Sequence, residues 1–279
     1  MAADASGNDT TAVFVPVTGT VCIAPYGTTL PTKAEMNTYG YTPPAAWKRA
    51  GLIVVDGGPA ATENRADSIE FWQDSYETNA GTGTLDLVVK LAETNANVRE
   101  ILRGVAPDGN NAIDVDIDAD VHYAIYVEEV GKDMGAGSPK RRRTYANSWL
   151  TQNSTDRSTR GEVNGNEATF KVKRHADHGG KHFTEVLVPY DATPSPYITS
   201  VIPSGATVGD YVMVEGNYLG TSGGDISAFT IDGQAVVTKT WVSASRVRAL
   251  VPASVSGAAA VVLTTTSGGA SNSYSYTAA

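Results

Sequence analysis

The chain has 279 residues, of which 41% are hydrophobic and 18% are charged, with one cysteine and a net charge of −9. This length allows one large β domain or two domains of ordinary size. The acidic balance argues against tight binding to nucleic acid, because phosphates are repelled, and a single cysteine excludes an intrachain disulfide. The chain shows neither a secretory signal nor the roughly 20 apolar residues of a membrane helix, so we expect synthesis in the cytoplasm and no membrane insertion.

The charge is unevenly distributed along the chain. Of the 30 acidic and 21 basic residues, four acids and three bases lie after residue 194, so the first 194 residues carry a net charge of −8. The acidity therefore belongs to the N-terminal part.

Three segments near the start of the chain have the pattern of β-strands. Residues 13–23 are rich in β-branched residues, and residues 68–76 and 84–91 alternate apolar and polar side chains. Gly81 and Gly83 separate the last two segments. We therefore predict a hairpin that joins residues 68–76 to residues 84–91.

One short helix is predicted after these strands. Thr94 is a suitable N-cap, and Gly104 and Pro107 are helix-ending residues. The helix would present one apolar stripe to a sheet, because its apolar residues fall at positions i, i+3, i+4 and i+7: Val98, Ile101, Leu102 and Val105.

A long alternating segment, residues 114–127, predicts the next strand. Its polar face begins with four aspartates, which form a candidate wetted face: Asp114, Asp116, Asp118 and Asp120. Further strands are predicted at residues 143–150, 168–174 and 183–188.

Two long stretches, residues 26–58 and 131–166, show no clear secondary-structure pattern. Loops of this length are uncommon in a compact monomer, so we expect them to become ordered against a neighbouring copy. The second stretch contains a basic run that can pair with acids across a subunit interface or, alternatively, touch DNA or anionic sugars. The candidate inter-subunit contacts are Trp47, Trp72, Lys140, Arg141, Arg142 and Arg143.

A proline-rich joint divides the chain. Three of the 13 prolines lie within residues 189–196, and proline favours an extended, semi-rigid linker. We predict a first domain at residues 1–190, a linker at residues 191–196 and a second domain at residues 197–279. The second domain has short strands separated by Gly, Pro and Ser turns, which is typical of a β-sandwich.

Several pieces of the first domain, taken in order, resemble the tail tube family of long-tailed phages. They are the segment Ile23–Thr32, a Trp47…Gly51-Leu52…Asp56-Gly57 step, Ser68–Asp74 before the predicted helix, and Phe183–Pro189. The resemblance implies a tail-tube-type β-sandwich or barrel with one short α-helix.

The second domain resembles an IPT/TIG-type Ig-like domain. The matching pieces are Pro196–Gly205, Val208–Leu219, Phe229–Gly233, Arg246–Pro252, Ala260–Gly268 and the final strand Ser273–Thr277. Relatives in transcription factors contact DNA, but the basic residues for that role are absent here. The expected fold is thus mainly β, with an Ig-like β-sandwich after the tail-tube-type domain.

The two resemblances together imply a structural protein of the virion tail, made in the host bacterial cytoplasm. Such subunits form homohexameric rings that stack into a tube, with the tape measure, tail terminator and tail tip proteins as further partners. DNA would pass through the tube without specific binding, and the four aspartates are our candidates for the face that lines it. The Ig-like domain would lie outside and bind host surface glycans weakly.

Three short segments match metal-binding or catalytic motifs only in part. Asp114–Asp118 lacks the glycine and glutamate of an EF-hand loop, and His175, His178 and His182 lack the helix and glutamate of a zinc protease. Gly220–Gly224 matches a nucleophile elbow in letters, but it has no histidine nearby. We therefore predict no catalytic residue, no metal and no cofactor.

Two other functions compete with the structural one. The first is a carbohydrate- or cell-surface-binding protein that uses the Ig-like domain. The second is a hydrolase with an accessory Ig-like domain, which would need a catalytic constellation that the sequence does not show.

Overall fold

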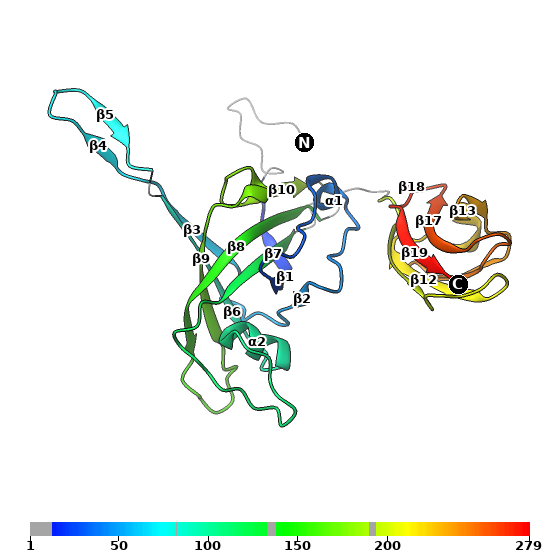
Figure 1. Ribbon diagram of the computed structural model, residues 1–279, viewed down its shortest axis with the longest axis horizontal. Coiled ribbons are helices and arrows are strands. Elements are labelled where there is room, and N and C mark those ends of the chain that lie inside the picture. Colours follow the sequence, from blue (N-terminus) through cyan, green and yellow to red (C-terminus); the bar gives the residue numbers. More distant parts are fainter. Residues whose placement is uncertain (1–12, 82, 133–137, 190–193) are drawn as a thin grey trace. The chain divides into compact units, whose positions relative to one another are not determined.

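The computed structural model describes residues 13–81, 83–132, 138–189 and 194–279, which form two compact units (Figure 1). Among the described residues, the first unit comprises residues 13–33, 45–81, 83–132 and 139–187, and the second comprises residues 34–44, 138, 188–189 and 194–279. Residues 191–193 of the predicted linker and residues 1–12 of the predicted first domain lie outside the described part. The domain boundaries stay a prediction.

The first unit is built on one large sheet. Its strand order is β2-β1-β7-β8-β9-β6-β3, with β10 paired to β8. The strands are β1 (Pro16–Pro25), β2 (Lys48–Arg49), β3 (Ala60–Asn64), β6 (Thr84–Leu91), β7 (His122–Gly131), β8 (Lys140–Thr155), β9 (Asn166–Val172) and β10 (Thr184–Val188). The expectation of a mainly β fold is confirmed.

The core of this unit follows from the alternation in β6. Leu85, Leu87, Val89 and Leu91 are at most 2% exposed, while the residues between them are half-buried. Fully burying such side chains contributes roughly 1.5–3 kcal/mol each. They pack against β7 and β9 and against the helix that follows β6.

The helix α2 (Ala96–Arg103) turns its apolar stripe to this core. Its N-cap is Asn95, not the predicted Thr94, because the Asn95 side chain accepts a hydrogen bond from the Val98 amide at 2.9 Å. Gly104 ends the helix with φ at 77°, as expected, and its amide donates to the Glu100 carbonyl. The predicted stripe residue Val105 lies beyond the helix and is exposed.

The predicted strand at 114–127 is wrong in its first half, because β7 begins only at His122. The side chain of Asp116 accepts a hydrogen bond from the Asp118 amide at 3.0 Å, a local turn that competes with strand pairing. Consequently Val115 and Ile117 are exposed rather than aligned on a buried face.

The predicted single strand at 68–76 is instead a hairpin of its own. Strand β4 (Ser68–Glu70) pairs with β5 (Glu77–Asn79), and Ser75 has a positive φ of 70° in the turn. The strands that pair with β6 are β3 and β9, and the sequence pattern did not reveal β3. Figure 1 shows the β4–β5 hairpin extending away from the large sheet.

The two stretches expected to be loops contain regular structure. The first includes the short helix α1 (Lys33–Asn37) and β2, so the chain has a second helix beyond the one predicted. The second includes β8, a strand of 16 residues. The elements α1, β2 and β8 therefore form within a single chain, without contact to a neighbouring copy.

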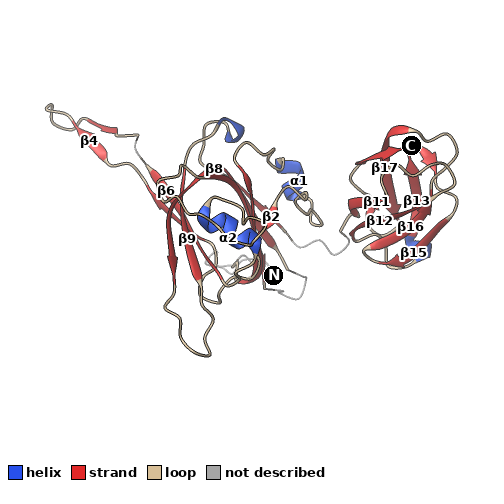
Figure 2. Cartoon of the chain, turned by 60° about the horizontal axis from the view of Figure 1, so that its bottom comes forward, coloured by secondary structure: helices blue, strands red, loops and turns tan. Residues whose placement is uncertain are grey.

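The second unit contains an Ig-like β-sandwich (Figure 2). One sheet has the order β11-β12-β16-β15, and the other has the order β14-β13-β17-β18 with β19 paired to β17. The strands are β11 (Tyr197–Ile202), β12 (Tyr211–Asn217), β13 (Ile226–Ile231), β14 (Gln234–Ala235), β15 (Lys239–Ser243), β16 (Arg246–Leu250), β17 (Gly257–Thr265), β18 (Gly269–Ala270) and β19 (Tyr274–Ala278). Side chains such as Val214, Val247 and Leu263, all 0% exposed, fill the space between the sheets.

Candidate interaction surfaces

The tip of the β4–β5 hairpin carries the most exposed aromatic side chain of the described chain regions. Trp72 is 99% exposed, and Ile69, Phe71 and Tyr76 are each more than half exposed. The Phe71 amide donates to the Tyr76 carbonyl at 3.0 Å, which closes the turn and holds these side chains on one small element. Exposed apolar clusters of this kind mark interaction sites.

The same hairpin is acidic. Residues 67–79 contain Asp67, Glu70, Asp74 and Glu77 and no basic residue. The surface therefore combines aromatic area with negative charge. Sequence reasoning singled out Trp72 but missed its neighbours, because the alternating pattern was assigned to one strand instead of a turn.

The first half of β1 leaves one side of the sheet open. β2 pairs only with Cys22 and Ile23, so residues 16–20 have β7 on one side and, among the described residues, no strand on the other. A cleft of 570 Å³ lies there between the start of β1 and residues 51–59. Its apolar lining includes Val17, Leu52 and Val55, which are all more than 60% exposed.

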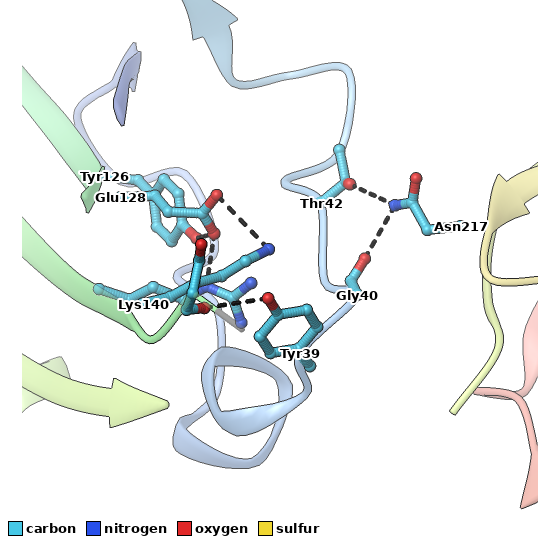
Figure 3. Close-up of polar contacts among 9 residues, drawn as sticks. Tyr39, Gly40, Thr42, Tyr126, Glu128, Lys140 and Asn217 are labelled. Carbon is cyan, nitrogen blue, oxygen red and sulfur yellow. Dashed lines mark hydrogen bonds and ion pairs between the residues drawn. The ribbon is translucent and has the colours of Figure 1, made fainter. Parts of the chain in front are cut away.

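The predicted basic contacts at 140–143 are paired within the chain. β7 and β8 place Glu128 opposite Arg142 and Glu129 opposite Arg141. The Glu128–Arg142 ion pair is 2.6 Å long, and the Arg142 side chain is 0% exposed. Figure 3 shows Glu128 with two further partners: the Tyr126 hydroxyl donates a hydrogen bond to its carboxylate, and the Lys140 amine lies 3.9 Å from its Oε1 atom.

On the other face of these strands, Glu129 binds two arginines. It accepts bidentate hydrogen bonds of 2.9 Å from Arg141 and a third of 2.9 Å from Arg143, which also contacts Glu185 at 2.8 Å. Burial lowers the pKa of Lys140. The four basic residues are thus largely buried and form ion pairs with glutamates of the same chain. Their role in contacts between subunits stays a prediction.

The two predicted tryptophan contacts lie in opposite environments. Trp47 is 5% exposed, and its ring meets the Tyr126 ring edge-on at a centroid distance of 6.4 Å. Trp72 is bare. Only Trp72 therefore offers surface to a second molecule in this conformation.

The four aspartates are exposed, but they do not lie side by side on one face of a strand as predicted. Asp114, Asp116 and Asp118 lie in the irregular segment before β7, and Asp120 Oδ1 lies at hydrogen-bond distance, 2.8 Å, from His122 Nε2. Their proposed position on the face that lines a tube stays a prediction.

The histidines occupy a polar turn. His175 caps the short 3-10 helix Ala176–His178 by accepting a hydrogen bond from the Asp177 amide, and His178 contacts the Thr184 hydroxyl at 3.0 Å. Burial lowers the pKa of His178 and of His182. Within the described residues, no three His, Cys, Asp or Glu side chains are grouped to hold a metal ion.

The segment that matches a nucleophile elbow in letters is a turn of the Ig-like sandwich. Ser222 precedes the 3-10 helix Gly223–Asp225, and the Gly220 carbonyl accepts a hydrogen bond from the Trp241 indole at 3.0 Å. Thus a strand–turn–helix context for a nucleophile is not formed at this point of the chain.

The outer face of the β11–β12–β16–β15 sheet carries a second exposed patch. The Arg248 guanidinium lies 3.8 Å from the centre of the Tyr211 ring, a cation–π contact. Arg246 pairs with Glu215 at 3.0 Å, whereas Arg248 has no ion pair within the residues described. Sequence reasoning did not single out this pair, since their proximity depends on strand register.

The helices of the described regions include none long and apolar enough to cross a membrane.

Comparison with protein families gives two matches. Residues 6–116 match a family described as phage tail tube protein, and residues 196–278 match the IPT/TIG domain. The tail tube match therefore ends before β7, and residues 117–195 belong to neither match. No curated protein matches the chain.

Two solved structures share low similarity with the chain. The crystal structure of gamma-CGTase from Alkalophilic bacillus clarkii is 16% identical over 58% of this chain and 25% of that chain, with a TM-score of 0.31. The Bacteroides ovatus mixed-linkage glucan utilization locus protein SGBP-B, in complex with a mixed-linkage heptasaccharide, is 15% identical over 82% of this chain and 66% of that chain, with a TM-score of 0.29. The chain thus spans a quarter of the first protein and just under two thirds of the second.

Proposed function

We propose that this chain, a structural phage tail protein with a tail tube region at residues 6–116 and an IPT/TIG domain at residues 196–278, assembles with itself into stacked hexameric rings. The stacked rings form a hollow tube of the virion tail, through which DNA is ejected. The tape measure, tail terminator and tail tip proteins are its further partners, and assembly follows synthesis in the host cytoplasm. The tail tube match indicates a non-enzymatic structural role.

One observation carries the self-assembly proposal: the bare aromatic tip of the β4–β5 hairpin. Trp72 is 99% exposed and Tyr76 is 67% exposed, so most of their apolar surface is in contact with solvent. Burying apolar area releases roughly 25 cal/mol per Å², and aromatic side chains dominate the energetics of many interfaces. In a symmetric homo-oligomer the surface that covers this tip comes from another copy.

The cleft beside β1 is a suitable binding site for the hairpin tip of another copy. It offers an open strand edge at residues 16–20 together with apolar side chains at Leu52 and Val55. An extended segment bound there gains main-chain hydrogen bonds from the edge and apolar contacts from the cleft. We propose that the hairpin of one copy binds this cleft of the next.

Charge supports passage of DNA without binding. The first 194 residues carry a net charge of −8, and six copies in a ring multiply the repulsion. The exposed Asp114, Asp116, Asp118 and Asp120 remain our candidates for the face that meets the DNA. Repulsion at that face keeps the phosphates from adhering during ejection.

Sedimentation of assembled particles tests the self-assembly proposal. Trp72→Ala removes the most exposed aromatic group of the described residues, so we expect pelleted tubes to fall by about tenfold or more, as for an interface hot spot of at least ~1.4 kcal/mol. The control Tyr211→Ala removes an aromatic group from the Ig-like sandwich and should leave tube formation unchanged. Tubes that pellet equally from Trp72→Ala and from the unmodified chain would remove the hairpin from the interface.

Surface binding by the Ig-like domain is a second candidate function. The Tyr211–Arg248 patch favours it, because an arginine that has no acidic partner among the described residues suits an anionic group of a host surface polymer. Binding of the unassembled chain to immobilised poly(glycerol phosphate) should weaken in Arg248→Ala and stay unchanged in Lys239→Ala. Equal weakening in both variants, or no binding by the unmodified chain, would reject this function.

A further inference from the structure

A short segment from the tail tube match packs into the unit that contains the Ig-like sandwich. Residues 34–44 fall within the tail tube match at 6–116, yet they group with residues 188–279 in one compact unit. We refer to residues 39–42, with the sequence Tyr-Gly-Tyr-Thr, as the clasp. Neither family match includes both the clasp and the sandwich.

Side-chain hydrogen bonds join the clasp to the end of β12. The Asn217 amide nitrogen donates to the Gly40 carbonyl at 2.9 Å and to the Thr42 hydroxyl at 3.0 Å (Figure 3). One side chain thus holds two successive parts of the clasp, a backbone carbonyl and a side-chain hydroxyl. Such a paired contact fixes register as well as position.

Two aromatic pairs flank these hydrogen bonds. The Tyr41 ring meets the Tyr197 ring edge-on at a centroid distance of 5.6 Å, and the Tyr39 and Tyr218 rings lie 6.0 Å apart. Tyr41 is 5% exposed and Tyr197 is 9% exposed. Aromatic pairs at this separation are favourable beyond the area they bury.

Gly40 lies where a side chain would be tightly confined. A Cβ atom at this position would come within 3.1 Å of the Tyr218 ring and 3.2 Å of the Tyr197 Cβ. Its backbone is not in the left-handed region, so a larger residue is disfavoured here by close contacts and not by backbone conformation. The close approach and the asparagine bonds are two independent signs that the fit is specific.

We infer that Tyr197, Asn217 and Tyr218 form a peptide-binding face of the Ig-like domain whose ligand is the clasp of the same chain. The IPT/TIG domain is therefore completed by a distant segment of the sequence. While the clasp is bound, this face is closed to external ligands, and removal of residues 194–279 uncovers the aromatic side chains of the clasp.

Hydrogen exchange on the full-length, unassembled chain tests the inference. Gly40→Val inserts a side chain against the two tyrosines, and Asn217→Ala removes the donor from the opposite side, so the test survives if the first variant misfolds. We expect exchange of the amides at 38–42 to quicken about tenfold or more in both variants, since each loses the hydrogen-bonded contact. Gly109→Val is the matched control, because a Cβ at Gly109 meets no atom within 4 Å.

Three outcomes would overturn the inference. The first is an unmodified chain in which amides 38–42 exchange as fast as an open loop. The second is equal exchange at these amides in Asn217→Ala and the unmodified chain. The third is protection that vanishes on dilution, which would assign the clasp to a second copy. All three are independent of whether the chain forms tubes, so the inference can fail while the proposed function stands.

Discussion

At the scale of single residues, burial decides what the charged side chains do. From the sequence, Lys140–Arg143 is predicted to pair with acids across a subunit interface, but strand register brings Glu128 and Glu129 of the same chain opposite it. The two acids are visible in the sequence, whereas the register that pairs them depends on long-range contacts. The sequence indicated that acids complement this run, and the structure pairs it with acids of the same chain, while its contact with a neighbouring subunit stays a prediction.

The buried Glu128–Arg142 pair gives the first prediction. Arg142→Met leaves Glu128 without its closest partner in a largely buried site, so unfolding free energy should fall by about 3 kcal/mol or more. Arg141→Met should cost less, about 1 kcal/mol, because Arg141 is partly exposed and Glu129 keeps Arg143. Denaturant unfolding of the unassembled protein measures both. Equal losses in the two variants would contradict the role of burial.

Tyr123 gives a prediction for alkaline pH. Its hydroxyl donates to the Glu100 carbonyl at 3.0 Å, and burial raises the pKa of Tyr123 to about 12 from 10.0. The unfolded chain therefore ionises first, so the contribution of this group is complete below pH 10 and is lost as pH rises toward 12. Across that window the unmodified chain should lose up to about 2–3 kcal/mol more than Tyr123→Phe. Parallel stability profiles of the two proteins would exclude this effect.

At the scale of elements, strong periodicity predicted structure well and turns were the main source of error. β6 and α2 have complete apolar patterns, and both form where expected. The segments at 68–76 and 114–121 also alternate, but an Asp-Ser turn and an Asx turn interrupt them. Local side-chain hydrogen bonds and the absence of a pairing strand outweighed the pattern there.

The start of α2 allows a direct comparison of the sequence reading with the structure. Asn95→Ala removes the side chain that caps the Val98 amide, so it should lower the unfolding free energy by about 1 kcal/mol. Thr94→Ala, at the cap position predicted from sequence, should change it by only a few tenths of a kcal/mol. Thermal unfolding of the two variants provides the measurement. A larger loss in Thr94→Ala would place the cap one residue earlier.

At the scale of the whole molecule, the sequence predicted a mainly β chain with a tail tube region and an Ig-like domain, and both family matches bear this out. It did not predict the clasp, because no local pattern relates residues 39–42 to a strand that ends at Asn217. It also did not reveal the bare hairpin tip, which depends on a turn within an alternating segment. Exposure and long-range packing, rather than composition, define both surfaces.

Electron microscopy of the purified protein, alone at high concentration and with tail initiator components, tests the central claim most directly. Self-assembly through the hairpin tip predicts hollow tubes or six-fold rings in at least one of the two preparations, with their loss in Trp72→Ala. Single subunits in both preparations, at concentrations where the fold is intact, would contradict a tube-forming role.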